Sequence, residues 1–276
     1  MKKSIEADTP RSCTGCSACM AACPKNAISV VMNEDGFLQA VVDKEQCIDC
    51  GICQTVCSRF ISPEKHTFLM EKCIVAGACS SDSTVHKTTT SGGLAYELSK
   101  WGIENGYKIF GVIYDYTLDK AVGVLVDTLS GLESLKGSKY LQADISEALC
   151  TLCNKTKKNP DGKYICFGTP CQIFGIRQLI ERKKLVGDFL LVDLFCHGVP
   201  SYNVWRSYVK TLHCQLGAFC KVNFRYKGNG WHQYTIRIDG EKGNYQEFAY
   251  KDMFYRFFFD NVALNNSCFT CDFRKS

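Results

Sequence analysis

A run of four cysteines with the spacing C-x2-C-x2-C-x3-C occurs twice near the start of the chain. Pro24 follows the first run, and Ser58 takes the corresponding position after the second. Three thiolates spaced two residues apart lie on one tight loop around a cubane cluster, while the fourth points away and binds the neighbouring cluster. The repeat therefore predicts two 4Fe-4S clusters, one bound by Cys13, Cys16, Cys19 and Cys57, and the other by Cys47, Cys50, Cys53 and Cys23.

Zinc is the alternative metal, because zinc ribbons also contain paired C-x2-C units. A zinc site needs four thiolates and has no use for a third cysteine two residues further along. Gly15 and Gly51 lie within the two runs and suit tight loops in which backbone N–H groups approach cluster sulfurs. The doubled four-cysteine run therefore favours iron–sulfur clusters over zinc.

The chain contains 19 cysteines in 276 residues, which is typical of either a disulfide scaffold or a metal protein. Secreted disulfide scaffolds are short and begin with a signal peptide, but the residues that follow Met1 form no apolar segment. No stretch reaches the roughly 18 apolar residues that a membrane span requires. The sequence thus predicts a protein of the reducing cytoplasm whose clustered thiols bind metal.

The net charge of +5 is a mild positive excess. No block of Lys and Arg is dense enough to form a phosphate-binding stripe, so nucleic acid is not expected as a partner. The run Lys155, Lys157 and Lys158 is expected at a solvated helix end or loop. With 46% hydrophobic and 22% charged residues, the chain is expected to fold around a substantial core.

Two short strands are expected between the cysteine runs, over residues 27–31 and 37–42, with a turn at Asn33-Glu34-Asp35-Gly36. With these strands, residues 8–62 resemble the bacterial dicluster ferredoxin domain.

A polar connector over residues 62–71 contains Pro63 and marks a domain boundary. We therefore expect a ferredoxin-like domain over residues 1–62 and a second domain over residues 63–276.

Apolar runs alternate with amphipathic stretches in the second domain. The pattern predicts strands at 73–79, 108–114, 121–127, 164–168, 189–196, 222–226, 234–238 and 245–250. It predicts helices at 90–105, 146–158, 171–185, 200–216 and 251–264. Such alternation indicates an α/β fold with at least part of its sheet parallel. The expected fold class is thus α/β, with an α+β ferredoxin-like module followed by a mixed α/β domain.

Two segments have the composition of ligand sites. Gly168 and Thr169 lie between an expected strand and the helix that starts at Pro170, and the carboxyl ends of such strands form ligand crevices in α/β sheets. The segment Thr90-Ser91-Gly92-Gly93 places hydroxyl and N–H groups at a helix N-terminus, which suits a pyrophosphate. An ordinary helix cap is the alternative for this second segment.

Four later cysteines are candidates for one more site. Cys171 and Cys196 follow two consecutive expected strands, and both thiols emerge at one sheet edge if these strands are parallel neighbours. Cys268 and Cys271 form a C-x2-C pair near the end of the sequence, and a loop that folds over that edge completes a four-thiolate site. The alternative is that these cysteines are buried apolar residues.

A set of motifs in fixed order carries a more specific resemblance. The motifs are Thr90-Ser91-Gly92-Gly93, Gly137-Ser138-Lys139-Tyr140, Gly168-Thr169-Pro170-Cys171-Gln172, Cys196-His197-Gly198-Val199-Pro200-Ser201, Phe224-Arg225-Tyr226-Lys227, Gly230-Trp231 and the final C-x2-C. The chain resembles the beta-subunit family of coenzyme F-420 hydrogenases and dehydrogenases, in its bacterial form with a fused dicluster ferredoxin. Family members usually continue well beyond the final C-x2-C, so we expect this sequence to be C-terminally short.

The resemblance implies a flavoprotein with FAD and a nearby 4Fe-4S cluster. It implies that Cys171, Cys196, Cys268 and Cys271 bind this third cluster and that the mixed α/β domain binds the flavin. By the same likeness, Ser91, Gly92, Gly93, Lys139, Gly168 and Thr169 line the FAD site. Lys139 is the candidate catalytic residue, because its charge would stabilise the reduced flavin; a surface lysine is the alternative.

The resulting hypothesis is an oxidoreductase that moves electrons between 4Fe-4S clusters and FAD. Its expected partners are a ferredoxin-type redox protein or complex subunit and a soluble hydride carrier or small-molecule substrate. Whether the carrier is coenzyme F-420 stays open. Two other hypotheses are an electron-transfer subunit without chemistry of its own and a truncated, inactive homologue that keeps only the ferredoxin module.

Overall fold

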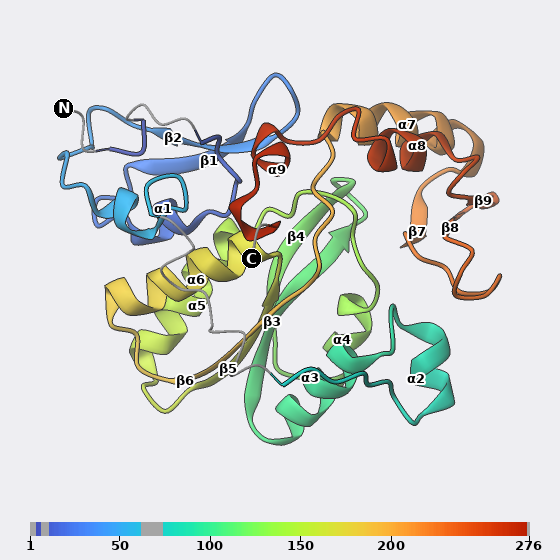
Figure 1. The fold of residues 1–276 in the computed structure, drawn as a ribbon, viewed down its shortest axis with the longest axis horizontal. Helices are drawn as coiled ribbons and strands as arrows, with labels where there is room; N and C mark the ends of the chain where they lie inside the picture. The colour runs from blue at the N-terminus through green and yellow to red at the C-terminus, as the bar shows by residue number, and fades with distance from the viewer. Residues whose placement is uncertain (1–3, 7–10, 62–73, 275–276) are drawn as a thin grey trace.

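The computed structural model of the chain describes residues 4–6, 11–61 and 74–274 (Figure 1). The expected connector at residues 62–71 and Cys73 lie outside the described residues.

A small module forms around the two cysteine runs. Strands β1 (Ile28–Met32) and β2 (Leu38–Val42) pair antiparallel, which confirms the expected hairpin. Gly36 closes the turn between them with φ +80°, a conformation that favours glycine. Two short helical segments, α1 (Ala18–Ala22) and η1 (Ile52–Val56), follow the first cysteines of each run and pack against each other.

The central sheet has the strand order β4-β3-β5-β6. Strands β3 (Tyr107–Asp115), β5 (Lys163–Gly168) and β6 (Asp188–Asp193) run parallel, and β4 (Lys120–Val126) pairs antiparallel with β3. The structure therefore confirms a mixed α/β fold with a partly parallel sheet. It also confirms that the strands before Cys171 and Cys196 are parallel neighbours.

Helices cover both faces of this sheet. Helices α3 (Leu94–Glu104) and α4 (Leu129–Leu135) contact β3 and each other. Helix α5 (Ser146–Lys158) contacts β4, and α6 (Pro170–Lys183) contacts β5 and β6.

The alternation of side chains along the strands explains these layers, because neighbouring residues of a strand point to opposite faces. Ile109 and Ile165 are fully buried in a core with residues of α3 and α4. The next residue of each strand, Phe110 and Cys166, belongs to the larger core that includes residues of α5 and α6. The sheet is therefore the middle layer of three.

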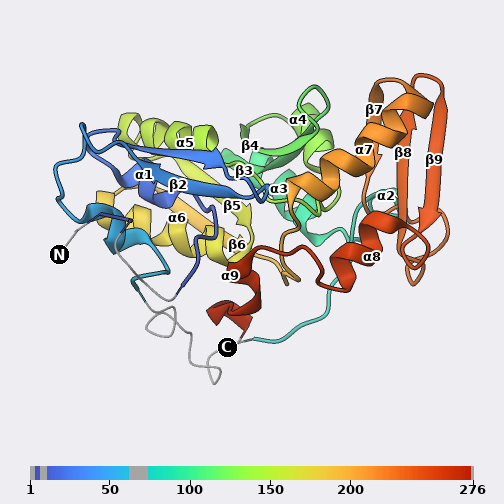
Figure 2. The same ribbon diagram turned by 90° about the horizontal axis from the view of Figure 1, so that it is seen from above.

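A second sheet lies at the other end of the molecule from the cysteine module (Figures 1 and 2). It consists of the antiparallel strands β7 (Phe219–Asn223), β8 (Thr235–Gly240) and β9 (Gly243–Phe248). Helix α7 (Tyr202–Leu216) contacts β8 and β9, and α8 (Met253–Phe259) contacts α7.

The cysteine module is docked on the central domain at two places. Helix α1 contacts α5 and α6, and η1 also contacts α6. The turn of the β1–β2 hairpin meets the start of α7, where the Tyr202 N–H donates to the Gly36 carbonyl at 2.9 Å and the Asn203 side chain donates to the Glu34 carbonyl at 2.8 Å. The module is thus fixed to both the α6 and the α7 side of the molecule.

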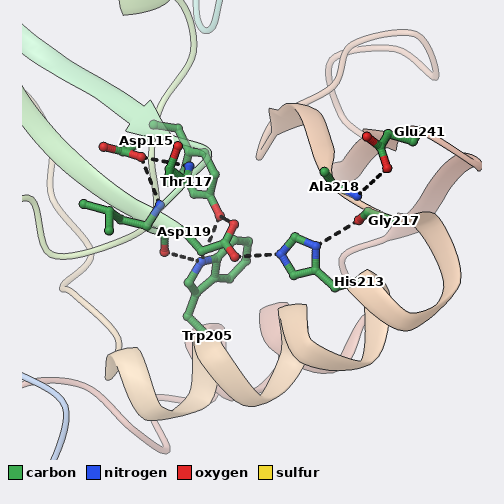
Figure 3. Close-up of polar contacts among 10 residues, drawn as sticks. Asp115, Thr117, Asp119, Trp205, His213, Gly217, Ala218 and Glu241 are labelled. Carbon is green, nitrogen blue, oxygen red and sulfur yellow. Dashed lines mark hydrogen bonds and ion pairs between the residues drawn. The ribbon is translucent and has the colours of Figure 1, made fainter.

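The β3–β4 turn is tied to α7 by a second set of polar contacts (Figure 3). The Trp205 indole N–H donates to the Asp119 carbonyl at 3.0 Å, and the His213 Nε2 atom lies 2.6 Å from the Asp119 carboxylate. The second ring nitrogen of His213 lies 2.9 Å from the Gly217 carbonyl at the end of α7.

Several expected elements differ from the structure. A strand was expected over 73–79, but residues 74–79 form no strand. Ile74 and Val75 are 95% and 92% exposed. A β-branched run forms a strand only where a neighbouring strand pairs with it. The strand expected at 189–196 ends at Asp193, so Cys196 lies beyond it. The helix expected at 251–264 ends at Phe259, because Asn261 adopts φ +59°.

Other differences concern short elements. Helix α2 (Ser83–Thr88), with the N-cap Asp82, and α4 were not expected from the sequence. Two further short segments, α9 (Asn266–Phe269) and η4 (Asp272–Arg274), contain or flank the final C-x2-C pair. None of the helices within the described ranges is both long enough and apolar enough to cross a lipid bilayer.

Candidate functional site

The structure gathers the first expected set of thiols around one cavity. Cys13, Cys16 and Cys19 of the first run line it together with Cys57, the last cysteine of the second run. Ile5, Val30 and Ala40 contribute the apolar part of the wall. The fourth thiol at this cavity therefore comes from the opposite run, and we call this cavity the first site.

The second expected set lines a separate cavity, which we call the second site. Cys47, Cys50 and Cys53 surround it with Cys23 from the first run. Its wall includes Lys25 and Asp49, and Cys50 is exposed. The second site thus has an exposed thiol at Cys50, whereas no thiol of the first site is exposed.

The loops that carry the thiols are tightly turned. Gly15 and Gly51 adopt φ +71° and +76°, so the tight loops inferred from the sequence are present. Ser17 and Asp49 also adopt positive φ angles, at 62° and 50°. Successive turns of this kind direct backbone N–H groups inward, and the Gly15 N–H lies 3.4 Å from the Cys13 sulfur. The loops therefore suit a ligand with negatively charged sulfur atoms.

The thiols of the first site are crowded together, which bears on whether they suit an iron–sulfur cluster. Burial raises the pKa of Cys57 to about 12, and the charges of Cys16 and Cys13 also raise it. Burial also raises the pKa of Cys19 well above its ordinary value, with added contributions from the thiols around it. Metal-bound thiols are deprotonated, so four crowded thiolates need the positive charge of iron nearby. Within the described residues, no three His, Cys, Asp or Glu side chains form a site for a single metal ion.

The four later cysteines also come together, at what we call the third site. Burial raises the pKa of the Cys171 thiol, and the charges of Cys16, Cys196 and Cys268 raise it further. Burial likewise raises the pKa of Cys196 to about 11, with contributions from Cys268 and Cys271. Cys171 and Cys196 follow the carboxyl ends of the neighbouring strands β5 and β6, and Cys268 lies within electrostatic reach of both.

A short pairing of distant segments positions this third site. Pro200 forms a bridge with Leu264, and the Ser201 N–H donates to the Ala263 carbonyl at 2.9 Å. This pairing brings Cys268 next to the segment after β6. Gly198 adopts φ +142°, and a Cβ atom there would lie 2.9 Å from Leu264 and 3.3 Å from the Cys268 Cβ atom, so only glycine fits.

The residues expected at the flavin are placed in three separate segments. Ser91, Gly92 and Gly93 precede α3, where Gly93 is the N-cap residue with φ +81°. A Cβ atom on Gly92 would lie 2.7 Å from the Ala78 carbonyl oxygen, so packing of the chain on itself accounts for this glycine. The Lys227 ammonium donates to the Ser91 carbonyl at 2.7 Å, which links two of the sequence motifs.

Lys139 is bound to the end of a helix. Its ammonium donates to the carbonyls of Ser134, Leu135 and Lys136 in the last turn of α4, at 3.2, 3.0 and 3.1 Å. Burial lowers the pKa of Lys139 to about 7. A lysine ammonium has three N–H donors, so this cap engages all of them.

Gly168 and Thr169 lie at the junction of β5 and α6. Thr169 is the N-cap of α6, where its N–H and hydroxyl both contact the Gln172 side chain at 3.1 Å. The Thr169 hydroxyl also lies 3.2 Å from the Cys171 sulfur. In the described part of the chain, no hydrogen bond joins this segment to the Ser91–Gly93 segment or to Lys139.

A cationic and aromatic group beside the Ser91 segment was not assigned a role from the sequence. The Arg225 guanidinium lies between the rings of Trp231 and Tyr234, at 4.0 and 3.7 Å from their centroids. The Lys227 ammonium lies 5.0 Å from the Trp231 ring. The ordered motifs at 224–227 and 230–231 are the sequence signal for this group, but no spacing rule predicts the stacking.

Two family models match the chain. Residues 12–61 match the 4Fe-4S dicluster domain, and residues 161–275 match the C terminus of the beta subunit of coenzyme F420 hydrogenase/dehydrogenase. No curated protein matches the sequence.

A solved structure similar to this chain is the xenon derivative of the F420-reducing NiFe hydrogenase complex from Methanosarcina barkeri, with 18% sequence identity and a TM-score of 0.47. The likeness covers 70% of this chain and 63% of that chain, so this chain spans less than two thirds of its neighbour's length.

The matched models cover the duplicated cysteine runs and the ordered motifs from Gly168 to the final C-x2-C pair. The 4Fe-4S dicluster domain accounts for two iron–sulfur clusters in the region of the first and second sites. This chain is therefore similar to a 4Fe-4S dicluster domain over residues 12–61 and to the C terminus of the coenzyme F420 hydrogenase/dehydrogenase beta subunit over residues 161–275.

Proposed function

We propose that the protein is an iron–sulfur flavoprotein oxidoreductase. It holds three 4Fe-4S clusters and one FAD, and it couples a ferredoxin-type partner to a hydride carrier or small-molecule substrate. When bound, FAD accepts a hydride and releases single electrons, which links two-electron chemistry to one-electron clusters.

The observation that carries this proposal is the gathering of twelve cysteines into three sets of four. Cys13, Cys16, Cys19 and Cys57 would hold the first cluster, and Cys23, Cys47, Cys50 and Cys53 the second. Cys171, Cys196, Cys268 and Cys271 would hold the third. Because a dicluster domain alone needs only eight thiolates, the third set supports a role for the second domain in electron transfer.

The flavin part of the proposal rests on the family match and on the motif segments. Ser91, Gly92 and Gly93 would provide N–H groups for the pyrophosphate at the start of α3. The Lys227 cation next to this segment, with Arg225 on the other contact of the Trp231 ring, would favour an anionic ligand. Lys139 and Thr169 also have partners within the chain, at the end of α4 and at the Gln172 side chain.

Anaerobic analysis of iron, acid-labile sulfide and extracted flavin tests the proposal directly. We expect about twelve irons and about one FAD per chain, because each cluster holds four irons. About eight irons without flavin would contradict the proposal and leave only the dicluster domain. Zinc in place of iron would contradict the cluster assignment as a whole.

A matched pair of variants tests the third site. Cys171→Ala is expected to lower the iron content by about four per chain and leave the first two clusters in place. The control is Cys166→Ala, because Cys166 is fully buried on β5 but belongs to none of the three sets. Equal iron content in both variants would remove Cys171 from the ligand set.

One observation favours a second candidate function, an electron-transfer subunit without a flavin. The six residues expected at FAD are divided among three segments that no hydrogen bond joins within the described ranges. Such a subunit would connect a partner enzyme to the clusters. Twelve irons with no flavin, and no reduction of a soluble acceptor by the isolated chain, would support this second candidate over the first.

A further inference from the structure

We infer that the three cysteine sites form a line in which the first site lies between the other two, and that Gly175 is the positioning residue of the junction between the first and third sites. This inference rests on the proposed function, since it requires the third cluster.

The junction is the contact between α1 and α6. Cys16 immediately precedes this contact on the module side, and Cys171 lies in the first turn of α6. Gly175 lies one turn further along α6, against the module. A Cβ atom on Gly175 would lie 2.9 Å from the Ala18 Cβ atom and 3.2 Å from the Cys16 sulfur. Any larger side chain would therefore move α6 away from Cys16.

The contacts between helices agree with this order. Helix α1 carries Cys19 of the first site, and it contacts α6, which carries Cys171 of the third site. The first site is therefore the neighbour of the third.

Arg11 strengthens the same junction from the other side. Its guanidinium forms an ion pair with Asp272 at 3.0 Å, one residue after Cys271 of the third site. It also donates to the carbonyl of Ser58 at 2.9 Å, one residue after Cys57 of the first site. The Arg11 side chain thus connects the segment after Cys57 of the first site to the segment after Cys271 of the third site.

The second site lies at the outer end of this line. Its thiol Cys50 is exposed, and the neighbouring Ile48 side chain is 58% exposed. An external one-electron donor would therefore reduce the second site, which would pass the electron to the first site and become oxidised again, and the first site would reduce the third in the same way.

Substitutions at two glycines, each within a helix, test the junction between the first and third sites. Gly175→Ala and Gly175→Leu should weaken the magnetic interaction between the first and third clusters in the electron paramagnetic resonance spectrum of the reduced protein. The larger side chain should have the larger effect, while the iron content stays at about twelve. The matched controls are Gly102→Ala and Gly102→Leu in α3, where the added Cβ atom meets Ile165 and Ile109 at 2.5 and 3.2 Å, on the other face of the sheet. A Gly175→Leu protein with all clusters and an unchanged interaction would overturn the inference.

Removing a terminal site tests the order in case Gly175→Leu loses clusters. A Cys47→Ala/Cys50→Ala protein should retain two interacting clusters, the first and the third. A Cys268→Ala/Cys271→Ala protein should also retain two interacting clusters, the first and the second. Two clusters without magnetic interaction in the Cys47→Ala/Cys50→Ala protein would overturn the inferred order of the three sites, although the proposed function would stand. About eight irons in the unmodified protein would overturn both, so the two failures are distinguishable.

Discussion

Gln142 shows how a single buried side chain joins the cysteine module to the rest of the protein. It is 3% exposed, its amide oxygen accepts from the Leu38 N–H at 2.7 Å, and its amide nitrogen donates to the Thr14 carbonyl at 3.0 Å. Thr14 lies inside the first cysteine run, so Gln142 supports the loop of the first site directly.

We predict that Gln142→Leu lowers the free energy of unfolding by about 1–3 kcal/mol, because it leaves buried backbone groups without a hydrogen-bond partner. The control is Gln215→Leu on the exposed surface of α7, which should have little effect. Anaerobic thermal unfolding, followed by the visible absorbance of the clusters, measures both. Equal unfolding temperatures of the two variants would contradict the structural role of Gln142.

Lys139 gives a prediction at neutral to alkaline pH. The pKa of Lys139 in the folded protein is about 7, below that of an exposed lysine. At pH values between these two pKa values, the unfolded chain still binds the Lys139 proton, whereas the folded protein has lost it. The free energy of unfolding should therefore rise with pH in this window, by at most about 1.4 kcal/mol per pH unit from this residue. Lys139→Met should remove that rise, whereas Lys155→Met at an exposed position should retain it. Thermal unfolding of both variants between pH 7 and pH 10 tests the prediction.

The spacing of the cysteines predicts which thiols share a site, but it predicts few of the residues that support them. The spacing rule gives the exchange of Cys23 and Cys57 between the runs, because the geometry of a cubane fixes it locally. Nothing in the spacing reveals Gln142 or Arg11, since their partners are far away in the chain. Lys139 was expected at a flavin from its motif alone, and its three bonds to the end of α4 appear only in the folded chain.

At the scale of elements, His213 joins the β3–β4 turn to the end of α7 (Figure 3). Both partners of the His213 ring, Asp119 and the Gly217 carbonyl, are acceptors, so only the doubly protonated ring donates to both. Burial lowers the pKa of His213, but these two hydrogen bonds and the charge of Asp119 outweigh burial, so its pKa is raised.

A raised folded-state pKa means that the folded protein holds the His213 proton more tightly than the unfolded chain does. This contribution to stability is complete below about pH 6.5 and is lost as the pH rises through the folded-state pKa. Asp119→Asn should therefore reduce the difference in unfolding temperature between pH 6 and pH 8. Asp239→Asn, which changes an acidic residue paired with Arg237 on β8, is the control. An identical pH difference in Asp119→Asn and the unmodified protein would show that the contact does not titrate.

Sequence patterns located the long elements better than the short ones. Helix α5 spans the expected residues, and β5 and α6 lie within one or two residues of their expected bounds, because their apolar periodicity extends over several turns or pairs. Helix α4 has only seven residues, and its N-cap Thr128 is a weak signal by itself. At Ile74 and Val75 the error is in the other direction, because the sequence predicted an element that the structure lacks. The β-branched composition favours a strand there, but these exposed residues have no strand to pair with.

At the scale of the whole molecule, the cysteine module and the central sheet share one hydrophobic core. Ala18 of α1 and Val56 of η1 belong to the same buried cluster as Leu149 of α5 and Ile176 of α6. The sequence suggested a boundary between two domains. The composition of a connector marks such a boundary, but it cannot reveal how the folded parts pack. A shared core couples the stability of its two halves.

We therefore predict that the module and the central domain unfold together. Loss of cluster absorbance and loss of far-ultraviolet circular dichroism should have the same midpoint on anaerobic heating, as expected for one cooperative unit. Leu149→Ala removes a fully buried side chain from α5, should cost about 2–5 kcal/mol, and should lower both midpoints by the same amount. Separate midpoints in the unmodified protein, or a fall in the dichroism midpoint alone in Leu149→Ala, would mean that the cysteine module is stable independently and that the α1–α6 contact does not transmit packing energy.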